Sequence, residues 1–357
     1  MHTATTSADS RQTAISPDRI DFTADKFLAC GRKSRHKLSF RLISQKFDMP
    51  PSSAPLPITL IGAATVDLIG RVTQDYIPQT SNPGRVHRRP GGVVRNVGVL
   101  LAGMGVAPTV ITSVGDDTAG TDTKTALTAA GIDLKLIPAG DFPTARYMAL
   151  HDDNGELIAA VADMDIIENM AADKVADILA AQPNNGLLLA DCGVSAKMLA
   201  QLSELKQDRL LMVETVSEPK SRRARNLIDR LDLVFTNRAE AGAMLDRIFA
   251  TPDAAAGALV DAGAGSAVVS DGPRDIAFAD QSGVRTLAIF AADVVDVTGA
   301  GDALVAGTMF GLSTGLTLAD AVDCGRAAAA IAVESIGAAP TISQQDLQKR
   351  LNRRRRT

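Results

Sequence analysis

From Ile58 onward, short apolar runs alternate with longer alanine-rich stretches in which apolar residues recur with helical period. This alternation is typical of a mainly parallel β-sheet whose faces are covered by helices. The predicted strands are 58–62, 109–113, 187–191, 210–214, 233–236 and 267–270. The predicted helices are 93–104, 121–130, 172–181, 222–230, 238–245 and 252–262. We therefore predict an α/β fold.

Two extended, partly polar segments interrupt the alternation, at 71–90 and 144–162. The second contains Asp152-Asp-Asn-Gly155, a sequence that favours the turn of a β-hairpin. We expect the two segments to form a small β-sheet that projects from the main layer. Such a sheet can serve as a lid over a site or as a contact between two copies of the chain.

Both ends of the chain are polar and locally basic. Residues 1–55 are predicted to be a disordered extension, for which translation from Met49 and a targeting segment remain alternative explanations. The domain is expected to span 56–345, and residues 346–357 are expected to be a basic tail whose arginine run, 353–356, is solvated.

Composition favours a small-molecule partner. A net charge of -4 provides no field that would attract nucleic acid or an anionic membrane. Cys30, Cys192 and Cys324 lie far apart, so neither a disulfide framework nor a zinc site is indicated. No apolar run approaches the roughly 18 to 20 residues that a membrane-spanning helix needs. These features predict a cytoplasmic protein.

The most informative segment is Asp296-Val-Thr-Gly-Ala-Gly-Asp302. A β-like run, 294–297, precedes the glycine turn, and an apolar-faced helix is predicted at 303–312. Free amides at the start of a helix, together with its dipole, can hold a phosphate group. Asp302 can then accept the proton of a hydroxyl that attacks phosphorus. Taken alone, the segment is better explained as an ordinary helix start.

Further motifs decide between these interpretations. They are 81–85, 91–96 with Gly91-Gly92 and Asn96, 113–117, 237–240, 270–272 and 296–302. In this order the chain resembles the ribokinase-like (PfkB) carbohydrate kinases over roughly residues 56–345. The resemblance implies a three-layer αβα sandwich with a mainly parallel sheet and a small β lid. It also implies phosphorylation of a substrate hydroxyl with ATP and Mg²⁺.

The resemblance also implies a role for each matching residue. The implied catalytic group is Asp302, with an anion hole formed by Gly299, Ala300 and Gly301. The implied substrate contacts are Asp67 at the end of the first strand, Gly91, Gly92 and Asn96. The implied nucleotide contacts are Asn237, Ser270 and Gly272, and Glu240 is expected to bind Mg²⁺ through water. Asn237 and Glu240 also fit a plain helix cap, and binding of K⁺ at Asp296 and Thr298 is left open.

Within the family, the chain resembles pseudouridine kinases. The matching segments include 144–147, 155–165 and 214–220. This resemblance implies phosphorylation of the 5'-hydroxyl of pseudouridine to give pseudouridine 5'-phosphate, and it fits a homodimer through the lid. Two departures are Cys192-Gly193, where an Asn is expected, and Gly98, where Ala is commoner. Ribokinase, another ribonucleoside kinase and a catalytically silent sugar or nucleoside sensor remain alternatives.

Overall fold

The computed structural model describes residues 54–354, so nearly all of the predicted N-terminal extension lies outside the described residues. Within this range, nine strands form the main sheet in the order β13-β12-β11-β10-β9-β8-β1-β4-β5. Their bounds are β1 Ile58–Ile61, β4 Thr109–Thr112, β5 Asp133–Leu136, β8 Asn185–Asp191, β9 Asp208–Glu214, β10 Leu233–Asn237, β11 Ala267–Ser270, β12 Ile276–Asp280 and β13 Gly283–Leu287. Neighbouring strands are parallel from β5 to β11, and β12 and β13 complete the sheet as antiparallel strands.

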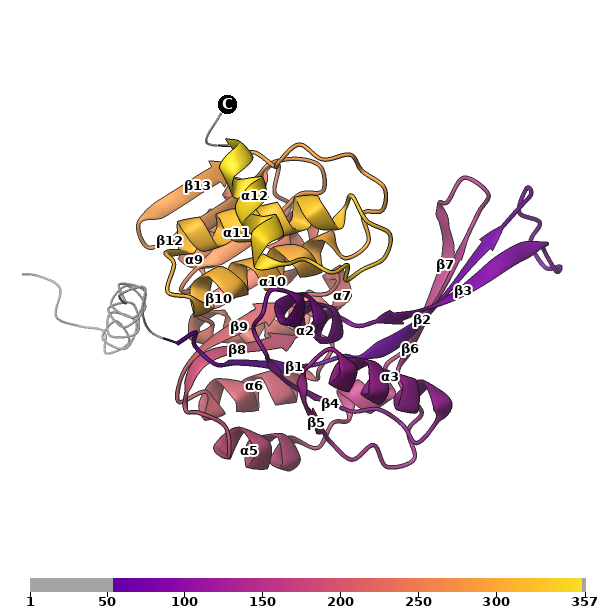
Figure 1. Cartoon of the computed structure of the whole chain (residues 1–357), viewed down its shortest axis with the longest axis horizontal. Helices are drawn as coiled ribbons and strands as arrows, with labels where there is room; N and C mark the ends of the chain where they lie inside the picture. Colours follow the sequence, from indigo (N-terminus) through magenta and orange to yellow (C-terminus); the bar gives the residue numbers. More distant parts are fainter. Residues whose placement is uncertain (1–53, 355–357) are drawn as a thin grey trace, which may run out of the picture.

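Helices cover both faces of this sheet (Figure 1). Their bounds are α2 Val93–Gly103, α3 Thr118–Ala129, α4 Asp165–Glu168, α5 Ala172–Ala180, α6 Ala196–Leu205, α7 Glu218–Ser221, η1 Arg222–Arg230, α8 Arg238–Leu245, α9 Pro252–Asp261, α10 Ala300–Ser313, α11 Leu318–Ala332 and α12 Gln344–Arg354. Successive strand residues enter opposite cores: Leu60 packs with α2 and α10, whereas Ile61 packs with α6 and α9. The predicted three-layer αβα sandwich with a mainly parallel sheet is confirmed.

Strand β1 lies where the chain changes direction along the sheet. After β1 the chain builds β4 and β5 on one side, and it later returns to place β8 on the other side. The carboxyl ends of β1 and its two parallel neighbours therefore lie at a topological switch point of the sheet. Ligands of open α/β sheets bind at this kind of position.

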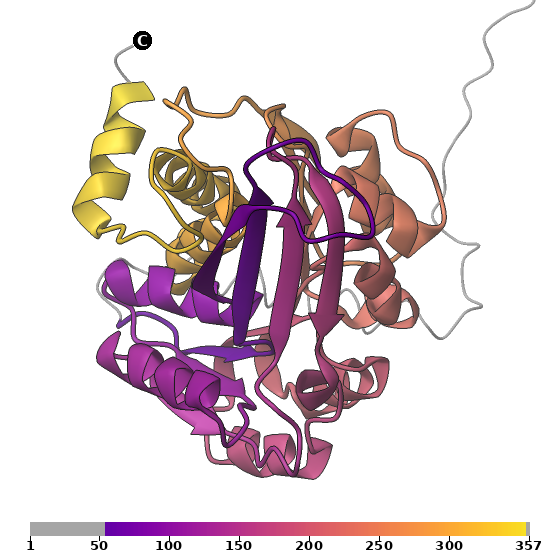
Figure 2. The same ribbon diagram turned by 90° about the vertical axis from the view of Figure 1, so that its right-hand side faces the viewer.

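A second sheet forms the predicted lid. Its strands are β2 Thr65–Val72, β3 Gly84–Gly91, β6 Arg146–His151 and β7 Leu157–Asp163, in the order β3-β2-β6-β7. The hairpin turn is present, because Asp152 donates its amide to the Glu156 carbonyl at 2.9 Å. The lid projects from the body in Figure 1, and its four strands face the viewer in Figure 2. It begins at Thr65 rather than residue 71, because β2 continues almost directly from β1.

Three local features differ from the prediction. Residues 294–297 form no strand, because they pair with no neighbouring strand and instead donate two amides to the Val333 carbonyl; Val294, Val295 and Val297 are exposed. Residues 222–230 are helical as predicted, but as a 3₁₀ helix. Residues 344–354 form α12, so most of the predicted basic tail is helical, and Leu347 and Arg350 are buried against the domain.

Gly98, Cys192 and Cys324 are all buried in the domain. A Cβ at Gly98 would lie 3.1 Å from Val110 Cγ2, so this glycine allows α2 to pack closely on β4. Cys192 and Cys324 are buried and form no disulfide with any described residue. Among residues 54–354, no helix combines the length and apolar character needed to cross a membrane.

Candidate active site

The glycine turn is the N-terminus of α10. Gly299 is the N-cap in the left-handed conformation, with φ 78°, and Asp302 lies in the first turn. Ala300 donates its amide to the Val297 carbonyl at 3.3 Å, whereas the Gly301 and Asp302 amides have no hydrogen-bond partner among the described residues. Two free amides and the positive end of the helix dipole therefore remain for an anion.

The Asp302 carboxyl contacts the substrate turn predicted around Asn96. Asn96, buried in the first turns of α2, donates from Nδ2 to Asp302 Oδ2 at 2.7 Å. Burial, together with the charges of the nearby Asp191 and Asp67, raises the pKa of Asp302 to about 7, against the lowering effects of Asn96 and Arg95. A carboxyl with this pKa is suited to exchange protons near neutral pH.

The substrate-binding residues implied by the resemblance lie together. Asp67 lies within the lid strand β2 instead of at the end of the first strand, because β1 ends at Ile61. Burial raises the pKa of Asp67, although a hydrogen bond from Thr65 and the charge of Arg95 oppose that rise. Added Cβ atoms would lie 2.2 Å from Asp67 Oδ2 at Gly91 and 2.3 Å from the Ala63 carbonyl at Gly92. Neither glycine can be enlarged without moving the turn.

Two further acids, the buried Asp191 and the half-buried Glu214, extend the site beyond the predicted residues. Asp191, at the end of β8, accepts the amides of Ala63 and Gly193 at 2.8 Å each, and thereby joins two loops. Burial and the negative charges of Glu240, Asp302 and Asp191 raise the pKa of Glu214 well above its usual range. The detectable signal was an acid that ends a buried strand at the carboxyl edge of the sheet, a position shared by Asp191 and Glu214.

The Asn237–Glu240 segment is a helix cap with a buried acid. Asn237 and Glu240 form a reciprocal capping box at the start of α8. Glu240 is buried, and its Oε2 also accepts a hydrogen bond from Thr215 Oγ1 at 2.5 Å. Ser270 pairs in register with Asn237 on the adjacent strand, and Gly272 follows in an open turn. These residues therefore adjoin one another, and Glu214 lies close enough to both Glu240 and Asp302 for their charges to raise its pKa.

Asp296 connects the catalytic turn to the turn after α11. Asp296 Oδ1 accepts the Thr298 amide at 2.9 Å, and Oδ2 accepts the Gly337 amide at 3.0 Å. Arg89 from the lid approaches Oδ2 at 3.4 Å. Both carboxylate oxygens are therefore engaged, so any cation here would depend on backbone carbonyl groups.

Together, these elements form a site that can transfer a charged group to a hydroxyl. A half-buried carboxyl with a pKa of about 7 lies beside free helix amides, and Asn96 contacts it directly. A base and an anion-binding helix end in contact are the groups that phosphoryl transfer to a hydroxyl requires.

Comparison with known proteins gives consistent matches. The sequence profile described as pfkB family carbohydrate kinase matches residues 57–345. Pseudouridine kinase from Escherichia coli (strain K12) is 28% identical over 271 residues, which cover 74% of this chain and 86% of that protein.

Solved structures agree in fold. A carbohydrate kinase from Agrobacterium tumefaciens superposes with a TM-score of 0.72 at 26% identity, over 83% of this chain and 97% of that one. Ribokinase from Arabidopsis thaliana, complexed with ribose and ATP, superposes with a TM-score of 0.72 at 19% identity, over 84% and 99% of the two chains. The second likeness concerns the fold alone.

Proposed function

Because this chain belongs to the pfkB family of carbohydrate kinases, we propose that it transfers the γ-phosphoryl group of ATP to the 5'-hydroxyl of pseudouridine. The observation that carries the reaction is the 2.7 Å hydrogen bond between Asn96 and the half-buried Asp302. It brings the proposed substrate turn and the proposed base into contact. Similarity to the Escherichia coli pseudouridine kinase supports the substrate.

In the proposed reaction, the substrate hydroxyl oxygen attacks the γ-phosphorus of ATP. The bond from that phosphorus to the bridging oxygen breaks, ADP leaves, and the hydroxyl proton passes to Asp302. The free amides of Gly301 and Asp302 and the dipole of α10 stabilise charge on the phosphoryl oxygens. Asp67, Gly91, Gly92 and Asn96 are proposed to hold the ribose, and Asn237, Ser270 and Gly272 the nucleotide. The lid is proposed to exclude water, which would otherwise compete as acceptor.

The acids around Glu240 fit a divalent cation that is bound largely through water. When bound, Mg²⁺ neutralises phosphate charge. Within residues 54–354, no group of three or more His, Cys, Asp or Glu side chains could hold a metal directly. The gathered charges of Glu214, Glu240 and Asp302 nevertheless favour a cation. We therefore propose that Glu240 holds Mg²⁺ through a bound water molecule. Phosphate oxygens and further waters would complete the coordination shell. K⁺ binding near Asp296 and Thr298 stays a prediction.

The test of the proposed function is ADP release with ATP and Mg²⁺ across pseudouridine, uridine, ribose, inosine, adenosine and fructose 6-phosphate. Selective turnover of pseudouridine supports the assignment. Turnover of ribose or another ribonucleoside, which the Cys192-Gly193 departure keeps as the alternative, retains the kinase and replaces the substrate. Folded protein that binds nucleotide but phosphorylates none of a broad panel would instead be a sensor.

The raised pKa of Asp302 predicts the pH dependence of the reaction. A base acts only when ionised, so we expect kcat/KM to fall as pH decreases through about 7. Well below that pH, the loss should approach about tenfold per pH unit, because ionised base becomes proportionally rarer. Initial rates between pH 5 and 9, with circular dichroism to verify folding at each pH, provide the measurement. A flat rate profile in folded protein contradicts Asp302 as the base.

A homodimer through the lid stays a prediction. Val86, Met148 and Val161 are exposed, and the strand register places all three on the lid face opposite Asp67. A second copy would cover these apolar side chains. Sedimentation equilibrium tests this, since a monomer at micromolar concentration would exclude a stable dimer. Cytoplasmic location also stays a prediction.

A further inference from the structure

Arg95 lies where its local surroundings oppose a positive charge. It is in the first turn of α2, close to the positive end of the helix dipole, and no acidic residue lies in that turn. Burial lowers the pKa of its guanidinium, although Asp67 and Asp302 oppose the change. Arg88 and Arg89 each pair with a carboxylate, whereas Arg95 forms no ion pair within the described part of the chain. The negative charges of Asp67 and Asp302, which lie outside the helix, offset part of these costs.

A hydrogen bond from Arg95 to Asn96 gives a reason for the position of Arg95. Arg95 Nη1 donates to Asn96 Oδ1 at 2.9 Å, and Asn96 Nδ2 donates to Asp302 Oδ2 at 2.7 Å. An amide side chain has an acceptor end and a donor end. With its oxygen held by Arg95, Asn96 must present its NH₂ group to the Asp302 carboxylate. Two hydrogen bonds in series thus connect the first turn of α2 to the first turn of α10.

We propose that Arg95 is a positioning residue for the phosphoryl transfer: it fixes the Asn96 amide so that this amide holds Asp302 toward the substrate hydroxyl. The inference rests on the proposed kinase function. Arg95 acts through Asn96, and its loss should let the amide rotate and the carboxyl move. Displacements of about 1 Å at a reacting group can reduce turnover about 100-fold.

The positive charge of Arg95 also supports Asp302 as a base, because it lowers the pKa of that carboxyl. The charged groups that face Asp302 are Asp67 of β2, Asp191 of β8, Glu214 of β9 and Arg95 of α2. The positive charge of Lys220 of α7 lowers the pKa of Asp191, against the effect of burial. Three of the four groups facing Asp302 are acids, so removal of Arg95 leaves Asp302 among negative charges. Its pKa should then rise, and less of the base should be ionised at pH 7.

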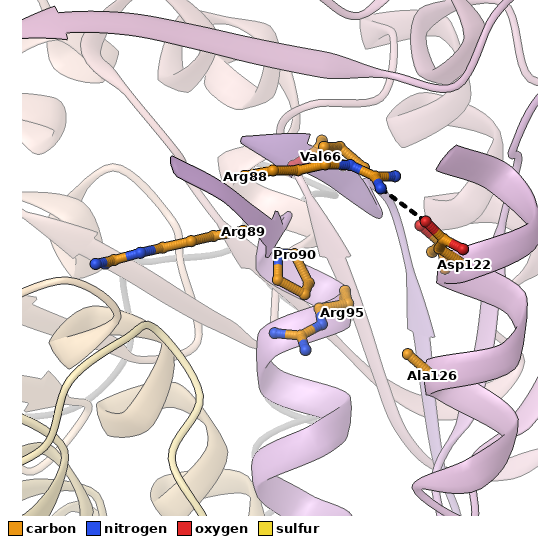
Figure 3. Close-up of a pocket in the computed structure, with 9 residues that line it drawn as sticks. Val66, Arg88, Arg89, Pro90, Arg95, Asp122 and Ala126 are labelled. Carbon is orange, nitrogen blue, oxygen red and sulfur yellow. Dashed lines mark hydrogen bonds and ion pairs between the residues drawn. The ribbon is translucent and has the colours of Figure 1, made fainter. Parts of the chain in front are cut away.

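A matched control lies in the same pocket. Arg95 borders a pocket of about 180 Å³ together with Arg88, Arg89, Pro90 and Asp122. Figure 3 shows Arg88 reaching Asp122 of α3, while the guanidinium of Arg95 turns away from α3. Arg88→Met removes a charge from the same pocket without touching Asn96, so it should leave turnover and its pH dependence unchanged.

Kinetics of Arg95→Met, Arg95→Lys and Arg88→Met against pH test the proposal. For Arg95→Met we expect kcat to fall about 10- to 100-fold, KM values to change little, and the acid limb of the rate profile to move to higher pH. Arg95→Lys retains a charge and a donor, so it should recover much of the loss. A merely structural role predicts a lower melting temperature and an unmoved acid limb, and this result would overturn the proposal.

A titration without turnover separates the proposal from the proposed function. Carboxyl ¹³C NMR of the folded protein, with Asp302→Asn to assign the signal, follows Asp302 directly. The midpoint should rise in Arg95→Met and stay near wild type in Arg88→Met; equal midpoints would overturn the proposal. If wild type phosphorylates no substrate, the proposed function fails while this titration still decides the role of Arg95. If Arg95→Met does not fold, Arg95→Gln provides the same test.

Discussion

Asp302→Asn should lower turnover about 100- to 10,000-fold, the usual contribution of a general base, while binding of ATP and nucleoside persists. The amide is nearly isosteric with the carboxyl and can still accept the hydrogen bond from Asn96. It cannot accept the proton of the attacking hydroxyl. Rates of ADP release give the loss, and isothermal titration calorimetry gives the two affinities. Wild-type turnover in Asp302→Asn would exclude this residue as the base.

The same variant should keep or gain stability. The pKa of Asp302 is raised from 3.8 to about 7 in the folded protein. Between these pH values the folded state binds more protons than the unfolded chain, so the free energy of unfolding falls as pH rises. Asn carries no such cost. We therefore expect Asp302→Asn at pH 8 to melt at or above the wild-type temperature, which separates lost chemistry from lost folding.

The central sheet could be predicted because its strands are buried on both faces. A parallel strand such as β8, with the run Leu187 to Asp191, is apolar almost throughout, and its sequence differs clearly from the helices between strands. All six predicted main-sheet strands are therefore present, as β1, β4, β8, β9, β10 and β11. The parallel β5 and the antiparallel β12 and β13 were missed; β5 and β13 are the two edge strands, and their composition gives little signal.

The error at 294–297 shows what composition cannot supply. Val294, Val295 and Val297 have strong β preference, yet all three are exposed and pair with no strand. A strand needs a neighbour that offers hydrogen bonds in register, and that neighbour depends on the whole fold. The backbone here instead donates to the end of α11.

In the candidate site, too, sequence motifs identified residues, but their contacts depended on the fold. Family motifs placed Asn96 and Asp302 in one site, but their hydrogen bond joins residues 206 positions apart and depends on how α2 and α10 pack. Asp191 and Glu214 were not selected because each was only the last residue of a strand. Arg95 was visible in the motif 91–96, yet its contact with Asn96 became apparent only once the helix turn was built.

Gly299→Ala should lower turnover about 100-fold by displacing the catalytic turn. A Cβ at Gly299 would lie 2.0 Å from the Ala338 carbonyl oxygen and 2.5 Å from Ala338 Cα. Both are backbone atoms of the turn after α11, so they cannot rotate away as a side chain would. The start of α10, which carries the free amides and Asp302, must then shift from its position. ADP release and thermal melting measure the two consequences.

Gly131→Ala separates this contact from backbone strain. Gly131 has the same φ of 78° as Gly299, but an added Cβ meets nothing within 4 Å. It therefore carries only the cost of the left-handed conformation, about 1 to 2 kcal/mol in the free energy of unfolding, with turnover unchanged. Equal losses of stability in the two variants, with turnover unchanged in both, would contradict this prediction. The close approach of Gly299 to the Ala338 backbone would then not position the catalytic turn. A selective loss in Gly299→Ala would mean that the turn after α11 positions the base as firmly as the substrate turn does.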